Sequence, residues 1–468
     1  MSARDRGTTA RGQPISRQSP SFFGEAKQLL VIAGPLAAAY LAELAMLATM
    51  KTVIGELGYR QLASIGLASD VSNQVLVVLF GLMSVVGVLA AQAIGSRELH
   101  NVGRAVHQGI VVATLLALPA AVLVWNLDHI LAFAGIDAEL VVLMEPFLKP
   151  QAASLFPVLW FFVLRMFVAS IAKTGAVMAI TVAAVVVNYI LCRGLILGEF
   201  GLPQLGVAGA GWAKLIVAVF QLGAIAAYAY LTPGMRGYGL FLGNKRIDRA
   251  MCAEILRLGL PVAGIVILEM SLFMFVTIGS GIIGPIAAAT HQVLMVWISL
   301  AFKTAHGLAE AGMIRVARGI GEGSLTKARL SGLVTMAMGV AWLTVLSFVP
   351  LTFPKPLVLV FLNPADPGFA QVLDLTTKIL VLAAFFQIFD GLQVMAALAL
   401  RGLKDTVVPL WIATIGYWLF GIGCGWLLAF QLELGAAGLW WGMATGLTVT
   451  GSLLGLRFLR LTRGGRAN

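Results

Sequence analysis

The sequence predicts an all-α polytopic membrane protein with twelve transmembrane helices in two parallel six-helix bundles. The first observation behind this prediction is composition: 59% of the 468 residues are hydrophobic, only 11% are charged, and the mean hydropathy is +0.93, which excludes the water-soluble classes. The second is a series of apolar segments whose lengths match the roughly 20 residues that a helix needs to cross a bilayer. The third is a tandem repeat that relates the two halves of the chain.

Twelve apolar segments have the length expected of membrane-spanning helices. We place them near residues 28–52, 68–92, 106–126, 139–162, 175–197, 207–231, 255–280, 288–313, 331–353, 373–399, 407–430 and 435–457.

The segments divide the chain into five parts. Residues 1–27 are polar and are expected to form a mobile cytoplasmic tail. An N-terminal six-helix bundle covers residues 28–234, and a C-terminal six-helix bundle covers residues 255–458. A basic cytoplasmic linker at 235–254 joins the bundles, and a basic cytoplasmic tail at 459–468 ends the chain.

The tandem repeat appears when 226 is subtracted from the numbering of the second half. Six helices per half is an even number, so both halves enter the membrane from the same side, and the repeat is parallel about an axis along the membrane normal. The matched landmarks are Pro35 with Pro261, Glu43 with Glu269, Gly58 with Gly284, Ala63 with Ala289, Gly81 with Gly307, and Ile94-Gly95 with Ile320-Gly321.

Lysine and arginine fall on alternate loops, which places both termini in the cytoplasm by the positive-inside rule. The net charge of +11 therefore reflects topology, and no nucleic-acid partner is expected. The residues assigned to cytoplasmic loops include Arg97, Arg104, Arg165, Lys173, Arg315, Arg318, Arg401 and Lys404.

Acidic residues inside the apolar segments are candidates for function. Glu269 lies a third of the way into an apolar run, where a charge costs roughly 2.5 to 3.5 kcal/mol on insertion scales and is rarely kept without a use. Its repeat mate Glu43 has two open interpretations, a role in a cavity or a charge pair with a neighbouring helix. Glu43 and Lys51 are eight residues apart, about 80° round the helix, so they are not expected to pair with each other.

Several runs resemble the multidrug and toxic compound extrusion (MATE) family, in its NorM-type branch. FFQIFDGLQVMAALALRGLKDT at Phe385–Thr406 is similar to the tenth-helix signature, and LPVAGIVILEMSLF at Leu260–Phe273 is similar to helix 7. IAAATHQV at Ile286–Val293 and QLGVAGAGWA at Gln204–Ala213 also resemble this family. The resemblance implies a MATE-like fold in a bacterial-type inner membrane. It also implies an antiporter that exports organic compounds by alternating access, driven by sodium or protons.

The resemblance also implies a cation-coupling pair, Glu269 and Asp390. A buried carboxyl group favours its neutral form, which it reaches by taking up a proton or by binding Na⁺. The chain departs from the family at Lys51, which lies in Met50-Lys51-Thr52 where related members carry Val-Asp-Thr. Lys51 is therefore a candidate to replace a bound cation or to attract an anionic or zwitterionic substrate.

Lys303, His306 and Glu310 follow the i, i+3, i+7 spacing of one helical face and must face protein or water. One interpretation is a proton-responsive or anion-binding track in a cavity. The favoured interpretation is structural: Lys303 pairs with Glu269 or Asp390, and Glu310 lies beside Arg315 at the cytoplasmic end.

The remaining expectations concern partners and chemistry. We expect a monomer in a lipid bilayer that takes a small organic substrate and has no cofactor other than the coupling ion, Na⁺ or H⁺. No metal site is expected apart from a possible Na⁺ at Glu269 and Asp390, and no motif supports an enzyme. The main alternative is a flippase for lipid-linked oligosaccharides or lipids, which would need a more basic cleft than Lys51 and Lys303 offer. A membrane-embedded enzyme acting on lipids would need a catalytic cluster that the sequence does not show.

Overall fold

The computed structural model describes residues 21–240 and 246–464, and over these residues the chain is helical without a strand. Among the described residues, eleven helical spans are long and apolar enough to cross a membrane. A twelfth long helix, α17, is not among these eleven, and its sequence contains glycine, threonine and tryptophan residues between the apolar ones. Short helices α5 (Leu127–Phe133), α9 (Pro233–Arg236) and α13 (Pro354–Leu359) lie in the connections.

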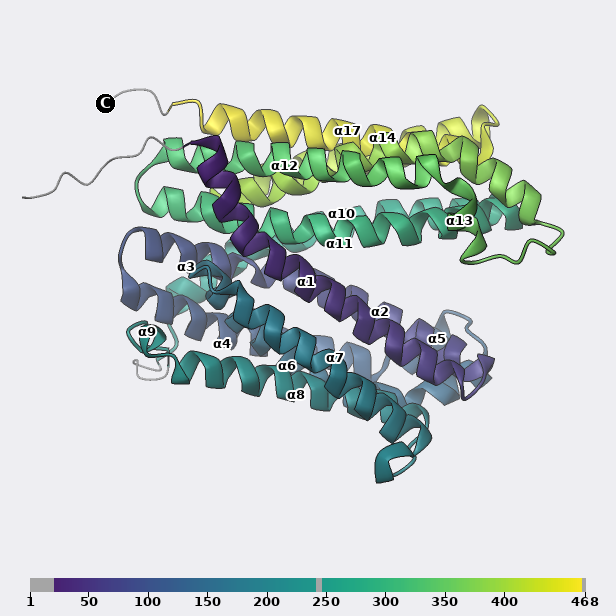
Figure 1. Cartoon of the computed structure of the whole chain (residues 1–468), viewed down its shortest axis with the longest axis horizontal. Coiled ribbons are helices and arrows are strands. Elements are labelled where there is room, and N and C mark those ends of the chain that lie inside the picture. The colour runs from purple at the N-terminus through teal and green to yellow at the C-terminus, as the bar shows by residue number, and fades with distance from the viewer. Residues whose placement is uncertain (1–20, 241–245, 465–468) are drawn as a thin grey trace, which may run out of the picture.

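Most of the long helices run side by side across the molecule (Figure 1). They are α1 (Phe22–Gly55), α2 with α3 (Tyr59–Met83 and Val85–Gly95, one continuous span), α4 (Leu99–Trp125), α6 (Ala138–Ser170), α7 (Thr174–Leu197), α8 (Val207–Leu231), α10 (Arg249–Ile283), α11 (Pro285–Gly321), α12 (Leu325–Thr352), α14 (Phe369–Gly402), the partly π-helical span Val407–Gln431 that contains α15 (Val407–Ala413) and α16 (Cys424–Trp426), and α17 (Gly435–Leu461).

Three helices extend into the predicted tails and linker. α1 begins at Phe22, where Ser21 accepts a hydrogen bond from the Gly24 amide and caps the helix. α10 begins at Arg249 inside the predicted linker, and α17 ends at Leu461 inside the predicted C-terminal tail. The rest of the N-terminal tail, residues 1–20, lies outside the described residues, as do 241–245 and 465–468. The division into two bundles stays a prediction.

The backbone repeats at the offset found in the sequence. Gly58 precedes α2 with φ 134° and ψ 165°, and its mate Gly284 precedes α11 with φ 143° and ψ 174°. Residues with a side chain rarely adopt this conformation, whereas glycine adopts it at little cost. The same sharp entry into the second helix of each half therefore requires glycine at both positions.

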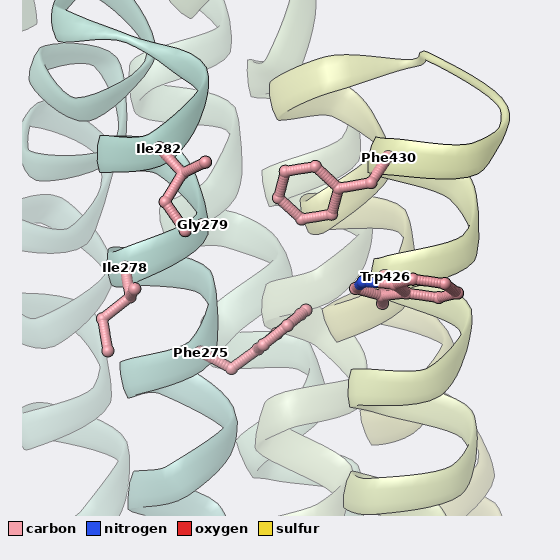
Figure 2. A pocket seen from close by; sticks show the side chains of 6 residues that line it. All are labelled: Phe275, Ile278, Gly279, Ile282, Trp426 and Phe430. Carbon is pink, nitrogen blue, oxygen red and sulfur yellow. The ribbon is translucent and has the colours of Figure 1, made fainter.

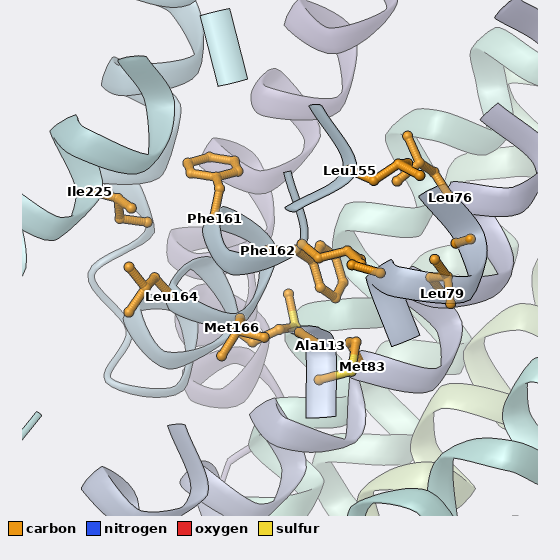
Figure 3. Packing of buried hydrophobic residues seen from close by; sticks show 14 of the residues in the cluster. Leu76, Leu79, Met83, Ala113, Leu155, Phe161, Phe162, Leu164, Met166 and Ile225 are labelled. Atoms are coloured by element: carbon orange, nitrogen blue, oxygen red, sulfur yellow. The ribbon is translucent and has the colours of Figure 1, made fainter. Parts of the chain in front are cut away.

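Two helices pass from one group of helices to the other. Leu29 and Leu36, early in α1, pack in a cluster dominated by α11 and α14, whereas Val53 and Ile54 belong to the core built from α2, α4 and α6. Figure 3 shows part of the core built from α2, α4 and α6, where side chains of α2 contact those of α6. α10 also contacts both groups of helices. Ile255, near its start, packs in the N-terminal core, and later residues of α10 pack against α14 and α17. In Figure 1, α1 crosses the molecule diagonally as a result.

The two halves meet closely at the end that holds both chain termini (Figure 1). A Cβ atom added to Gly95 of α3 would lie 2.4 Å from the Arg318 carbonyl oxygen, and one added to Gly321 of α11 would lie 2.1 Å from the Gln92 carbonyl oxygen. Gly95 and Gly321 are repeat mates, so the contact lies where the two halves exchange equivalent positions. Backbone-to-backbone packing of this kind is typical of small residues at membrane helix interfaces.

We predict that Gly321→Leu destabilises the protein by about 1 to 3 kcal/mol, because the added side chain overpacks the α3–α11 contact. Gly281→Leu is the matched control, since a Cβ atom there would meet open space. Thermal unfolding of both variants in detergent measures the difference. Equal melting temperatures for the two variants would contradict the close contact.

Candidate functional site

A cavity of about 460 Å³ lies between the two halves. Its wall combines aromatic and methionine side chains with a small number of polar and charged ones. The aromatic and methionine residues are Tyr40, Phe80, Phe162, Phe273, Phe302, Met166, Met270, Met274, Met295 and Met313. The charged or titratable residues besides Tyr40 are Glu269, Lys303, His306, Glu310, Asp390 and Arg401. A mainly apolar cavity with a few convergent polar groups is the usual form of a site for organic ligands.

A second hollow, of about 290 Å³, lies between α10 and the span Val407–Gln431 (Figure 2). Its wall consists of glycine, aliphatic and aromatic residues, and Ile282 in it is 71% exposed. Such a surface suits contact with lipid tails and offers no charged group. We therefore take the charged cavity between the halves as the candidate site.

Glu269 of α10 and Asp390 of α14, the predicted coupling pair, both line this cavity. Asp390 is 1% exposed, and its Oδ1 atom has no hydrogen-bond partner among the described residues. Neither carboxylate forms an ion pair within the part of the chain that the structure describes. Gln393, one turn after Asp390 on α14, also lines the cavity and has a buried Oε1 atom without a partner. The site thus contains acidic and amide oxygens that protein side chains leave open.

Lys303, His306 and Glu310 face this cavity from α11, as the helical spacing predicted. The favoured pairing of Lys303 with Glu269 or Asp390 is wrong: Lys303 forms no ion pair with any described acid, and its Nζ atom lies 5.9 Å from the centre of the Tyr40 ring. The physical reason is that α1 crosses into this region and places an aromatic ring beside the lysine.

Glu310 does not lie beside Arg315, contrary to prediction. It accepts a hydrogen bond of 2.5 Å from the Tyr40 hydroxyl and pairs with Arg165 at 3.3 Å. Arg315 pairs instead with Glu25 of α1, at 2.6 Å. α1 again explains the difference, because it brings one partner to Glu310 and another to Arg315.

Arg165 was assigned to a cytoplasmic loop, and this assignment is wrong. The residue lies within α6 and is 2% exposed. Its Nη1 atom is 2.9 Å from Glu43, and its guanidinium lies 4.4 Å from the centre of the Tyr40 ring, within the range of a cation–π contact. Glu43 is therefore the charge partner of a neighbouring helix, one of its two predicted roles, and it does not line the cavity.

The network of Tyr40, Glu43, Arg165 and Glu310 was not predicted, although the apolar run FFVLRMFVAS around Arg165 indicates a buried arginine. The boundary of the predicted helix, at residue 162, hid that signal. The observed helix continues to Ser170.

Lys51 is not part of the cavity wall, and it pairs instead with an acid of another helix. Its Nζ atom lies 2.8 Å from Asp70 of α2, and the two side chains are 35% and 57% exposed. Asp70 comes from the next helix, and which acid of another helix approaches a lysine depends on helix packing.

Arg401, also assigned to a loop, lies in the last turn of α14 and lines the cavity. It is 9% exposed and donates a hydrogen bond of 2.7 Å to the Ser84 hydroxyl on the other half. α14 runs to Gly402, which is three residues beyond the predicted end at 399. Arg401 is one of these three residues. The cavity therefore contains a buried cation that the loop assignment had excluded.

The MatE family model matches residues 35–193 and 261–427, and the two matched blocks begin at the repeat mates Pro35 and Pro261. The chain belongs to the MatE family. This confirms the resemblance to the MATE family that the sequence motifs indicated.

Relatives of this MatE protein include proteins named "Probable multidrug resistance protein NorM". The one from Rhizobium meliloti (strain 1021) is 35% identical over 434 residues, 93% of each chain. The one from Pseudomonas aeruginosa is 36% identical over 440 residues, 94% of this chain and 90% of the relative. These matches confirm the NorM-type branch.

Solved structures share the fold. A eukaryotic MATE transporter, AtDTX14, superimposes with a TM-score of 0.84 at 24% identity, covering 95% of this chain and 99% of that one. An outward-facing MATE transporter of the MOP superfamily gives a TM-score of 0.85 at 17% identity, covering 95% and 97%. The all-α fold with twelve transmembrane helices is thus confirmed.

We predict that Arg165→Gln destabilises the protein by about 3 to 5 kcal/mol, because it leaves the buried carboxylate of Glu310 without a counter-charge. Arg60→Gln is the control: Arg60 also pairs with a glutamate, Glu139, but both side chains are about half exposed, and such pairs contribute at most about 1 kcal/mol. Chemical or thermal unfolding in detergent measures both. If Arg165→Gln lowered the free energy of unfolding no more than Arg60→Gln does, the buried network would not stabilise the protein.

Proposed function

We propose that this protein is a secondary active multidrug efflux transporter that exchanges an organic compound for Na⁺ or H⁺ by alternating access. One observation carries the proposal: the same cavity between the halves joins Glu269 and Asp390, two carboxylates without an ion pair in the described chain, to an aromatic and methionine-rich wall. The names of the NorM relatives support the same activity. They do not favour the flippase alternative.

The apolar part of the wall accounts for broad substrate range. Methionine side chains are flexible and polarisable, so they adapt to ligands of different shape, and aromatic rings stack on flat organic cations. Five methionines and five aromatic residues face the cavity. Selectivity then depends mainly on the few charged groups.

The two carboxylates account for exchange. When Glu269 and Asp390 are charged they favour a cationic substrate, and when a proton or Na⁺ neutralises them that attraction is lost. The open oxygens of Asp390 and Gln393 suit a hard cation, which prefers oxygen ligands. Substrate and coupling ion thus compete for the same negative charge, which couples their movements in opposite directions.

Alternating access requires that the cavity close at one end while it opens at the other. Three contacts support closure at the end with the termini: the Gly95–Gly321 approach, a 3.2 Å hydrogen bond from Gln92 Nε2 to the Gly402 carbonyl, and a 2.8 Å ion pair of Lys404 with Glu254. Since basic residues cluster at this end, we place it, with both termini, in the cytoplasm. The cavity is then closed toward the cytoplasm, in a multi-pass protein of the bacterial inner membrane that we propose works as a monomer.

In liposomes with an imposed Na⁺ or proton gradient, we predict that the protein moves a fluorescent organic cation and that Asp390→Asn lowers this movement by about tenfold or more, within the usual range of coupling energies. Asp374→Asn is the control, because Asp374 lies on the same helix but is exposed and pairs with Lys378. Dye flux against each gradient separately shows which ion couples.

Unimpaired gradient-driven flux in Asp390→Asn would contradict the coupling role. Flux that ignores both gradients in the native protein would contradict secondary active transport itself and return the flippase to consideration.

A further inference from the structure

Glu310 of α11 is held by residues of the other half of the chain. The Tyr40 hydroxyl donates a 2.5 Å hydrogen bond to its Oε2 atom, and the Nη2 atom of Arg165 lies 3.3 Å from the same oxygen. The Oε1 atom of Glu310 is buried and has no hydrogen-bond partner in the described chain. One carboxylate oxygen therefore joins the two halves, while the other has no partner there.

Arg401 of α14 has the complementary arrangement. Its Nη1 atom donates a 2.7 Å hydrogen bond to the hydroxyl of Ser84, which lies between α2 and α3 in the other half. Its buried Nε atom has no partner among the described residues. Ser84 and Glu310 are mates at the repeat offset. Each of these mates thus contacts an arginine of the opposite half, Arg401 in one case and Arg165 in the other.

Glu310 and Arg401 also lie near each other within the C-terminal half. A Cβ atom added to Gly402, the residue after Arg401, would lie 2.7 Å from the carbonyl oxygen of Met313, which is one turn after Glu310 on α11. α14 and α11 are therefore in backbone contact beside these two side chains, and both side chains line the cavity. A guanidinium presents its donors in a plane that matches a carboxylate.

Opening the cavity toward the cytoplasm requires the halves to separate at the end where α3 and α11 are in backbone contact. This movement takes Glu310 away from Arg165 and takes Arg401 away from Ser84. A charged group that loses its partner in apolar surroundings is strongly disfavoured. Each of the two groups on the C-terminal half therefore needs a new partner in the second state, and each can supply what the other lacks.

We propose that Glu310 changes its partner during the transport cycle. It pairs with Arg165 while the cavity is closed toward the cytoplasm, and it pairs with Arg401 when the cavity opens there. This exchange of partners rests on the proposed alternating access. It keeps the carboxylate balanced in both states, so that neither state is much more stable than the other. Glu310 and Arg401 thereby set the populations of the two states.

A distance across the closed end tests the exchange. His100→Cys and Lys327→Cys place spin labels at two exposed positions, at the starts of α4 and α12, one on each half. The three native cysteines are first replaced by alanine, in a background that retains dye flux. Pulsed electron–electron double resonance in lipid nanodiscs without substrate then gives the populations of the short distance, for the closed state, and of the long distance, for the open state.

We expect Arg401→Gln to lower the ratio of the open to the closed state by about tenfold or more, because glutamine still bonds to Ser84 but cannot balance the charge of Glu310. Arg401→Lys keeps the positive charge and should restore most of the ratio. Lys378→Gln is the matched control, since it removes an exposed cation from the same helix and should leave the ratio unchanged.

A double variant shows whether Arg401 acts through Glu310. In the Glu310→Gln background no carboxylate has to be balanced at this position, and Arg165 keeps Glu43 as its partner. Arg401→Gln should therefore have little further effect on the ratio of the two states in this background.

An unchanged ratio in Arg401→Gln would overturn the exchange of partners. An equal shift with and without Glu310→Gln would also overturn it, because Arg401 would then act independently of the carboxylate. A native protein fixed at one distance, together with absent dye flux, would contradict alternating access itself. Intact flux with an unshifted ratio would contradict only the exchange of partners.

Discussion

A charge buried among apolar helices has to be balanced by a neighbour, and Arg165 shows how this fold meets that requirement. The arginine lies in the middle of the packing, with Glu43 and Glu310 on its nitrogens and the Tyr40 ring across its face. Its partners come from two other helices, α1 and α11, so the pairing also holds both of them against α6. Removing the arginine would leave the buried carboxylate of Glu310 without a counter-charge.

Buried charges are paired differently at repeat-related positions of the two halves. At the repeat offset, Glu269 corresponds to Glu43, and Ser84 corresponds to Glu310. Arg165 of the N-terminal half pairs with Glu43 of the same half and with Glu310 of α11, across the halves. Arg401 of the C-terminal half donates to the Ser84 hydroxyl, and Glu269 forms no ion pair in the described part of the chain. The first network combines two carboxylates with one guanidinium and joins the halves. The second site leaves acidic and basic groups facing the cavity.

The crossing helices connect these two sites. α1 and α10 each pack partly against one half and partly against the other, and the halves touch directly where Gly95 meets Gly321. At this contact the two backbones approach so closely that no side chain fits between them. Tyr40 of α1 contacts Lys303 and Glu310 of α11, so a change of charge in the cavity acts directly on a helix shared by both halves.

The sequence by itself determined the membrane class, the twelve helices, the repeat and the acidic residues of the cavity. These follow from local composition and spacing: an apolar run of sufficient length forms a helix in lipid because its backbone has no other partner, and an acid within such a run faces the protein interior. Only the tertiary structure decided which charges pair. Lys51 with Asp70, Glu310 with Arg165 and Arg315 with Glu25 each join residues from different helices, and ion pairing depends on distance in space, which the path of α1 sets. For the same reason Arg165 and Arg401 were taken for loop residues, because hydropathy alone cannot tell a cation at a helix end from one that neighbouring helices bury.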